Sequence, residues 1–383
     1  MRAFGNARLA AIQPSAIRAI HDRKRATSID LGMGQPTLQP SIEPFEAALQ
    51  WVREHGSPYA PPGGLHELRE SVARIYGGYH HGKASNVAVL NGSQEGIYLT
   101  IKALIDPQID EVLLTDPDYL SYQRCCDLEG VAYRKLRLSP DDGFAIHADA
   151  LLDAMTPATR LIILGSPGNP TASVMEEREV RRLAYALTER KGSPVWVAVD
   201  EVYRELTFTG KPYPSLLDHY PHAIALQSLS KSCALTGLRL GFFIGPASAV
   251  EAVVRAHALM VLNVNIFAQR VALEIMRDPR RLRAHHAWYV AQRQVLLESA
   301  YSNGVHIIEP QGSFYSMLAL PEAWSSSEAA ADHLLERYDV VTVPGIVFGA
   351  GAEGYLRLSW VAPPASLVVG IERIAEFCSK KPG

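Results

Sequence analysis

The sequence predicts an α/β fold with a main domain and a smaller α+β domain. A chain of 383 residues is long enough for two domains of this kind. Short apolar runs that are typical of buried strands alternate with helical patterns up to about residue 245. Beyond Asn303, short strands alternate with two helices, over Glu328 to Tyr338 and Ala365 to Cys378, and this mixture indicates the smaller α+β domain.

Composition and charge are those of an ordinary globular protein. Hydrophobic residues make up 48% of the chain and charged residues 20%, and the formal net charge is -3. This charge gives no reason to expect binding to nucleic acid or to a membrane. The N-terminus has no apolar core of a signal peptide, and the four cysteines show no disulfide pattern, so we expect a cytoplasmic protein. His285 and His286 lack the spacing of metal ligands, so no metal site is predicted.

A lysine lies in a loop of small residues between two apolar runs, Ala223–Leu226 and Leu240–Ile244. In such a place the ammonium of Lys231 can lose its water, which lowers its pKa and makes the amine a nucleophile toward an aldehyde. The hydroxyl of Ser228 and the guanidinium of Arg239 suit a phosphate group beside it. These features predict a Schiff base between Lys231 and pyridoxal 5'-phosphate (PLP). The alternative is a solvated loop lysine.

An acid ends the next apolar run toward the N-terminus. Asp200 directly follows Val195–Val199, and a carboxylate in an apolar setting is costly unless it is paired. A pyridinium nitrogen is a suitable partner, because the carboxylate keeps the ring protonated and able to accept electrons. A helix-capping role is the alternative for Asp200.

The strand Val87–Leu90 is followed by a small-residue turn and a helical pattern from Ile97 to Leu104. Free N–H groups and the helix dipole make such a turn a cradle for an anion. Gly92, Ser93 and Gln94 are therefore candidate phosphate ligands. The alternative is that Ser93 only caps the helix.

Two further strand ends carry side chains suited to a flat ring. Tyr119 follows the strand Glu111–Thr115 and can stack on such a ring. Core packing is the alternative for Tyr119, and it is favoured for Tyr122. Asn169 follows Leu161–Leu164, and the next residue is a proline that fixes its backbone. A turn asparagine is the alternative for Asn169.

Gly34 and Arg357 are candidates for contact with a substrate. The glycine allows a ligand close to the backbone, although a plain turn is the alternative. Arg357 alternates with apolar residues on a predicted strand, Tyr355 to Leu358, and its planar fork suits an α-carboxylate. A surface salt bridge is the alternative for this arginine.

These segments occur in one order that resembles the class I/II aminotransferases, the fold-type I PLP enzymes of the aspartate aminotransferase superfamily. The matching motifs are S-L-S-K-S-C-A-L-T-G-L-R-L-G-F around Lys231, N-P-T after Gly168, D-E-V-Y from Asp200, and Y-A-P-P-G-G-L-H-E-L-R from Tyr59. They extend from about Gly32 to Ser359. The usual Glu-Pro-Asp-Phe is here Gln35-Pro36-Thr37-Leu38, which leaves the subfamily open.

The resemblance implies a large PLP domain over residues 40–280, with a mostly parallel seven-stranded sheet. Residues 1–39 and 281–383 would form the small domain. The implied cofactor residues are Gly92, Ser93, Gln94, Tyr119, Asn169, Asp200, Tyr203, Ser228, Lys231 and Arg239. Of these, Asn169 and Tyr203 would hydrogen-bond the phenolic oxygen of the cofactor. Gly34, Asn169 and Arg357 would bind the substrate, and Tyr59 would cross a homodimer interface to the partner's cofactor phosphate.

The implied reaction moves an amino group between an L-amino acid and a 2-oxo acid, with Lys231, Asp200 and Tyr203 as the catalytic residues. Two other possibilities remain open at this point. A PLP-dependent lyase for carbon–sulfur β-elimination, or other chemistry at Cα, can use the same fold. A non-catalytic PLP-binding regulator usually carries an added DNA-binding domain, for which this sequence has no space. The sequence does not identify the amino donor or acceptor.

Overall fold

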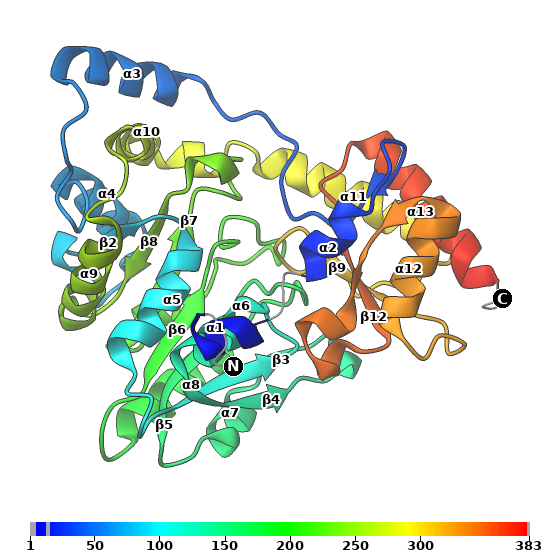
Figure 1. The fold of residues 1–383 in the computed structure, drawn as a ribbon, viewed down its shortest axis with the longest axis horizontal. Coiled ribbons are helices and arrows are strands. Elements are labelled where there is room, and N and C mark those ends of the chain that lie inside the picture. Colours follow the sequence, from blue (N-terminus) through cyan, green and yellow to red (C-terminus); the bar gives the residue numbers. More distant parts are fainter. Residues whose placement is uncertain (1–4, 13–15, 381–383) are drawn as a thin grey trace.

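A seven-stranded mixed sheet forms the centre of the computed structural model, which describes residues 5–12 and 16–380. The strand order is β2-β8-β7-β6-β5-β3-β4, and within this sheet only β8 runs against the other strands (Figure 1). The strands are β2 (Val87–Leu90), β3 (Glu111–Asp116), β4 (Ala132–Arg137), β5 (Thr159–Gly165), β6 (Trp196–Asp200), β7 (Ala223–Ser228) and β8 (Gly241–Ile244). The predicted α/β fold with a mostly parallel seven-stranded sheet is confirmed.

Both faces of this sheet are covered by helices, because alternate residues of each strand point to opposite apolar layers. In β5, Ile162 and Leu164 belong to one layer, and Leu161 and Ile163 to the other. The first layer is completed by α3 (Glu43–His55), α4 (His66–Tyr76), α7 (Ala148–Ala154), α8 (Glu177–Glu189) and α10 (Ile266–Arg277). The second is completed by α5 (Ser93–Leu104), α6 (Ser121–Glu129) and α9 (Ala247–Val261).

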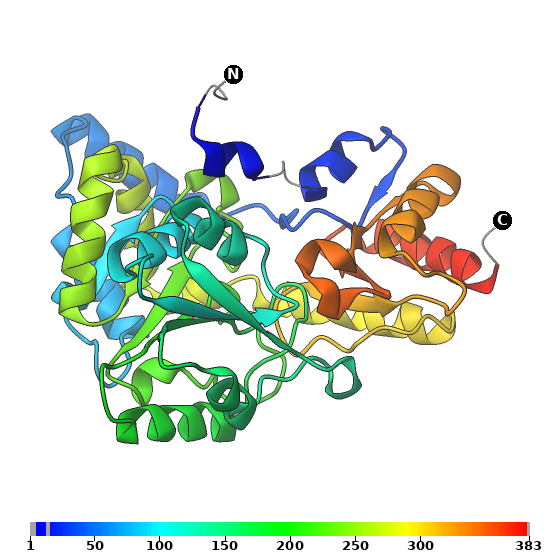
Figure 2. The same ribbon diagram turned by 60° about the horizontal axis from the view of Figure 1, so that its bottom comes forward.

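A second, smaller body lies to one side of the central sheet (Figures 1 and 2). It contains an antiparallel sheet of order β11-β12-β9 and has its own apolar core. Its elements are β9 (Tyr315–Ala319), β11 (Val343–Pro344), β12 (Tyr355–Ser359), α11 (His286–Ser302), α12 (Ser327–Tyr338) and α13 (Pro364–Ser379). The predicted domain limits at residues 40 and 281 stay a prediction.

The N-terminal segment is tied to this smaller body. Strand β1 (Ile29–Asp30) pairs in parallel with β10 (Val340–Val341). Two short helices, α1 (Ala7–Ala11) and α2 (Ala16–Asp22), precede β1. The pairing places the loop after β1, which carries Gly34, next to the C-terminal strands.

One predicted strand, from Val305 to Ile308, is not formed as a regular strand. Within it, only Ile307 makes an isolated bridge, to Leu318. The segment makes two hydrogen bonds to β9, from the Ile308 N–H to the Met317 oxygen and from the Ala319 N–H to the His306 oxygen, but these do not extend into a regular ladder. No helix of the described residues is both long and apolar enough to span a membrane.

Candidate active site

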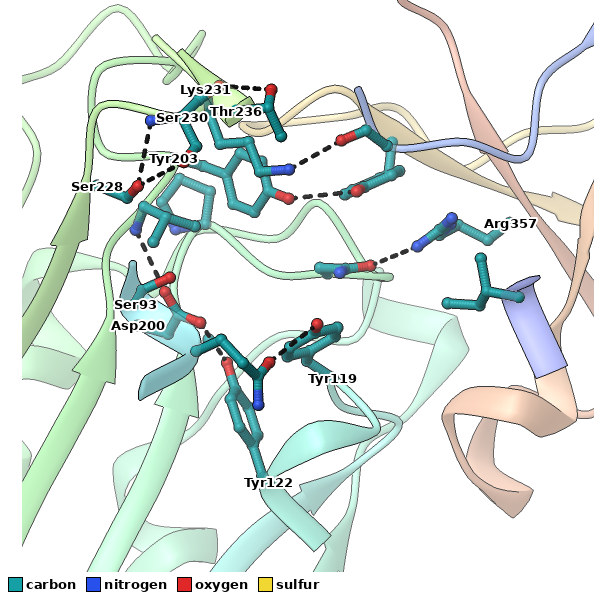
Figure 3. A pocket seen from close by; sticks show the side chains of 18 of the residues that line it. Ser93, Tyr119, Tyr122, Asp200, Tyr203, Ser228, Ser230, Lys231, Thr236 and Arg357 are labelled. Atoms are coloured by element: carbon teal, nitrogen blue, oxygen red, sulfur yellow. Dashed lines mark hydrogen bonds between the residues drawn. The ribbon is translucent and has the colours of Figure 1, made fainter. Parts of the chain in front are cut away.

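A cavity of about 250 Å³ opens at the carboxyl ends of β5, β6 and β7, beside the smaller sheet (Figure 3). Such an edge is where open α/β sheets bind ligands. The predicted residues that line it are Gly34, Ser93, Gln94, Tyr119, Asn169, Asp200, Tyr203, Ser228, Lys231, Arg239 and Arg357. Gly92 directly precedes Ser93 in the same turn, whereas Tyr59 does not line this cavity and is 85% exposed.

Lys231 lies in the turn between β7 and β8, and its Nζ donates a hydrogen bond to the backbone oxygen of Gly34 at 2.8 Å. Burial lowers the pKa of Lys231, and the charge of Arg357 acts in the same direction, while Tyr315 and Asp200 oppose the shift. The lowered pKa favours the neutral amine, which is the nucleophilic form. Figure 3 shows Lys231 and Arg357 pointing toward the same space from different sides.

Asp200 ends β6 and is only 7% exposed. Its Oδ2 accepts a hydrogen bond from the Tyr122 hydroxyl at 3.1 Å, and its Oδ1 accepts one from the Val202 N–H at 3.4 Å. Burial raises the pKa of Asp200 to about 6, although these two donors and Lys231 lower it. The carboxyl is therefore buried without a direct cationic partner among the described residues, and a charged N–H group in the cavity would stabilise its ionised form.

The turn before α5 forms one end of the cavity. Gly92 has φ of +87°, and a Cβ at this position would lie 2.7 Å from Nη2 of Arg239. The positive φ favours glycine there, and a Cβ would displace the end of the Arg239 side chain. The N-terminal N–H groups of α5, Arg239 and the Ser228 hydroxyl thus gather at one place, which is the arrangement expected for a phosphate.

The side chains of Glu95 and His257 form a hydrogen-bonded pair that supports this turn. Glu95, in the first turn of α5, accepts hydrogen bonds from the backbone N–H of Asn91 at 2.6 Å and from Nδ1 of His257 at 3.0 Å. These hydrogen bonds lower the pKa of Glu95, against the effect of burial. The ionised carboxylate therefore fixes the turn that contains Gly92 and Ser93.

Arg357 forms the opposite end, on β12, and is 1% exposed. Its Nη1 donates to Oδ1 of Asn169 at 3.0 Å and its Nη2 to the backbone oxygen of Gly32 at 2.6 Å. Nε of Arg357 has no hydrogen-bond partner within the described part of the chain. Because Arg357 lines the cavity, its planar guanidinium can bind a carboxylate placed there.

Tyr119, in the loop after β3, and Tyr122, in the first turn of α6, close a further side. The Tyr119 hydroxyl donates to Oε1 of Gln94 at 3.2 Å, and its ring lines the cavity. Tyr122 packs in the apolar core as predicted, but its hydroxyl also reaches Asp200. The prediction of core packing was therefore right for the ring and missed the hydroxyl.

Tyr315 is a cavity residue that the sequence did not reveal. Its ring lies 4.2 Å from the guanidinium carbon of Arg357, and its hydroxyl accepts a hydrogen bond from the Tyr203 hydroxyl at 3.2 Å. A Cβ on Gly34 would come within 1.9 Å of Oη of Tyr315, so a glycine is required there. Thr236 and Ile17 also line the cavity without having been predicted as site residues, and Ser230, whose hydroxyl like that of Ser228 suits a phosphate, lines it too.

A comparison with known families places this site in context. Residues 26–374 match the family described as aminotransferase class I and II. The chain belongs to the class I and II aminotransferase family.

Several aminotransferases are similar over almost their whole length. This aminotransferase is 28% identical to the aspartate aminotransferase of Pyrococcus horikoshii, over 96% of this chain and 95% of that protein. It is 30% identical to a probable N-acetyl-LL-diaminopimelate aminotransferase of Bacillus subtilis, over 92% and 90% of the two chains. The solved structure of the Thermus thermophilus aspartate aminotransferase with maleate superposes with a TM-score of 0.90 at 27% identity, over 98% and 100% of the two chains.

These similarities confirm the family and the fold type predicted from the sequence motifs. They also show that the chain is an enzyme that transaminates.

Proposed function

We propose that this aminotransferase uses pyridoxal 5'-phosphate to move an amino group between an L-amino acid and a 2-oxo acid. The observation that carries the proposal is that the amine of Lys231, the carboxyl of Asp200 and the guanidinium of Arg357 meet at one cavity. They offer, in the same space, a nucleophile, a partner for a protonated ring nitrogen and a binding group for a carboxylate.

The residues present fit this cofactor. The α5 turn with Arg239 and Ser228 suits its phosphate, Asp200 suits its ring nitrogen, and the ring of Tyr119 offers a face for stacking. Asn169 and Tyr203 are placed to hydrogen-bond the ring oxygen. When bound, the cofactor supplies an electron-accepting ring that stabilises negative charge on the substrate Cα.

The chain itself binds, orients and moves a proton. The guanidinium of Arg357 and the backbone near Gly34 hold the substrate carboxylate, while the bonds to Asn169 and Gly32 keep the guanidinium in one orientation. Lys231, with its lowered pKa, takes the proton from the substrate Cα and returns it as a general acid. Because Asp200 is buried, its charge acts in a medium that screens it weakly.

We further propose a homodimer in which Tyr59 completes the partner's site. Tyr59 is 85% exposed, and Leu259 at the end of α9 is 88% exposed, next to the exposed side chains of Met260, Val261 and Leu262. A Cβ on Gly63 would lie 3.5 Å from Val254, so the Tyr59 loop and α9 are neighbours. Such an apolar surface suits an interface. The free cysteines Cys125, Cys126, Cys233 and Cys378 support a cytoplasmic location.

The test of the function is Lys231→Ala, with Lys191→Ala as the control for losing an exposed lysine. We expect Lys231→Ala to lose the visible absorbance of the bound cofactor and all measurable transamination, while Lys191→Ala keeps both. With wild-type protein and an amino donor alone, pyridoxamine phosphate should accumulate in a stoichiometric amount. Release of pyruvate and ammonia instead would contradict the proposal. The names of the relatives make aspartate and aromatic amino acids the first donors to test.

A further inference from the structure

The loop after β1, which runs from Gly32 to Gly34, contacts two of the side chains on which the proposed function rests. The backbone oxygen of Gly32 accepts the 2.6 Å hydrogen bond from Nη2 of Arg357, and that of Gly34 accepts the 2.8 Å bond from Nζ of Lys231. A shift of this loop changes the orientation of the guanidinium, and the binding of a carboxylate depends on that orientation. The groups that fix the loop therefore influence how tightly a substrate carboxylate is held.

The strand pairing that precedes the loop ends at Leu31. The N–H of Leu31 donates to the oxygen of Val341 at 3.0 Å, and its oxygen accepts from the N–H of Ser359 at 2.7 Å. The next two residues, Gly32 and Met33, lie beyond β1, so their N–H groups need another acceptor.

The side chain of Asp30 is this acceptor. Its Oδ1 accepts hydrogen bonds from the backbone N–H groups of Gly32 and Met33, each at 3.0 Å. Its Oδ2 accepts a hydrogen bond from Nζ of Lys24 at 2.9 Å and lies 2.9 Å from Nδ1 of His21. A short acidic side chain that binds the N–H groups just after it defines a turn. The carboxyl of Asp30 thus takes over from the strand ladder where the ladder ends.

The carboxyl of Asp30 is ionised at neutral pH. Burial raises its pKa, but the hydrogen bonds from Lys24, Met33 and Gly32 together outweigh burial and lower the pKa below its ordinary value. Hydrogen bonds to an ionised acceptor are stronger than those between neutral groups. Asp30 does not line the active-site cavity, so any effect that it has on the substrate passes through the loop.

We propose that Asp30 is a positioning residue for the substrate carboxylate, a role that rests on the proposed transamination. Asp30 holds the Gly32 oxygen where it orients Arg357, and through the same turn it fixes the backbone that leads to Gly34. Without the carboxylate, two N–H groups lose their acceptor, the turn relaxes, and the guanidinium loses a fixed partner. Asp30 makes no hydrogen bond to Asp200 or to the α5 turn within the described part of the chain, so cofactor binding is unaffected.

Two substitutions separate the acceptor from the charge. Asp30→Ala removes both, whereas Asp30→Asn keeps an Oδ1 that can accept from the same two N–H groups. We expect the KM for the amino donor to rise about tenfold in Asp30→Ala and about threefold in Asp30→Asn, with kcat within about twofold of wild type. Lys24→Met should raise KM by less than about twofold, because the side chains of Lys24 and Asp30 are 37% and 20% exposed.

Asp339→Asn is the matched control for loosening the N-terminal segment. The Asp339 carboxylate accepts hydrogen bonds from Arg25, Thr27 and Ser28, just before β1, but it does not line the active-site cavity. Its φ of +57° is also suited to asparagine. If Asp30 only stabilised the fold, Asp339→Asn and Asp30→Ala would change thermal unfolding and KM alike. We expect both to lower the unfolding temperature and Asp30→Ala alone to raise KM.

A binding measurement gives a result that does not depend on turnover. The probes are succinate and 3-phenylpropanoate, which correspond to aspartate and phenylalanine without the amino group. Calorimetry on the holoenzyme should show that the probe that binds wild-type protein more tightly is weakened about tenfold by Asp30→Ala and is unaffected by Asp339→Asn. The visible absorbance of the bound cofactor should be the same in all these variants.

Three results would overturn the proposal: an unchanged KM and probe affinity in Asp30→Ala, an equal rise of KM in Asp339→Asn, or failure of both probes to bind wild-type protein. If Asp30→Ala does not fold, Asp30→Asn decides, since a KM rise of about threefold supports the role and an unchanged KM refutes it. Wild-type protein that does not transaminate would contradict the proposed function itself. A wild-type protein that transaminates, together with an Asp30→Ala variant of unchanged KM and probe affinity, would contradict only the assignment of Asp30.

Discussion

Asp118, in the loop after β3, and Asp200, at the end of β6, are both buried carboxyls, and they differ in what surrounds them. Asp200 accepts hydrogen bonds from Tyr122 and from the backbone of Val202, and its pKa is raised only to about 6. Asp118 has no donor among the described residues, and its pKa is raised to about 8. Burial acts in the same direction at both sites, so the donors account for much of the difference. Hydrogen-bond donors to a buried carboxyl, rather than its degree of burial, therefore indicate whether it is ionised in the folded protein.

The difference also separates two kinds of cavity. Asp200 shares a small cavity with Lys231, and a single charged N–H group in that cavity would stabilise its ionised form. Asp118 lines a larger cavity with Lys135, but its two carboxyl oxygens are buried and have no hydrogen-bond partner among the described residues. Three substitutions test whether this contrast is real.

The largest effect is expected from removing the charge at Asp200. Asp200→Asn should lower kcat/KM by about 10²–10³-fold, as for the loss of a buried electrostatic group at a reacting centre. Asp118→Asn is the matched control and should change kcat/KM by no more than about twofold. Steady-state kinetics on protein with measured cofactor content checks both. Equal losses of kcat/KM in the two variants would show that the two carboxyls do not differ in function.

The second-largest effect is expected on the free energy of unfolding when Asp118 is replaced. Its carboxyl has a raised pKa in the folded chain, so the folded state holds a proton that the unfolded state releases from about pH 4 upward. The free energy of unfolding of wild-type protein therefore falls as pH rises toward 8. Above that pH this loss of stability has reached its full size. Asp118→Asn should remove it, with a relative gain of up to about 1.4 kcal/mol per pH unit.

Chemical denaturation at pH 6, 7 and 8 measures this gain, with Asp127→Asn as the control for losing an acid at the same cavity. A difference between wild-type protein and Asp118→Asn that stays constant with pH would mean that Asp118 has an ordinary pKa in the folded chain.

The smallest effect should come from making Asp200 more like Asp118. Tyr122→Phe removes one donor to the Asp200 carboxylate, which disfavours the ionised form and raises its pKa. We expect the cofactor to bind about threefold to tenfold more weakly, from the loss of about 1 kcal/mol. The pH below which cofactor affinity falls should move upward. Equilibrium dialysis against pH measures both quantities, and an unchanged profile would show that the Tyr122 hydroxyl does not support Asp200.

Most of the cavity could be predicted because its residues follow apolar strands directly. Asn169 and Asp200 stand at or just beyond the ends of β5 and β6, so a parallel sheet brings them to one edge regardless of finer detail. Lys231 follows β7 by three residues and is placed by the same rule. Local patterns were sufficient for these positions.

Residues that depend on contacts between distant segments were missed. Tyr315 meets Arg357 only through the antiparallel register of β9 and β12, in which Arg357 pairs with Met317 and Ser359 with Tyr315. Asp118 lies in the same short segment as Tyr119, yet its burial depends on the path of residues 346–349, which no local pattern describes. The failed strand at Val305–Ile308 has the same origin, since pairing partners decide whether an apolar run becomes a ladder.

The bond between Arg357 and Gly32 joins residues that lie 325 positions apart. During synthesis, the ribosome must therefore have released nearly the whole polypeptide before the carboxylate-binding wall can close. The central sheet can form earlier, since its last strand ends at Ile244. A newly made chain thus passes through a stage with a folded sheet and an unfinished catalytic centre, and a shortened translation product ending before β12 would be unable to hold substrate.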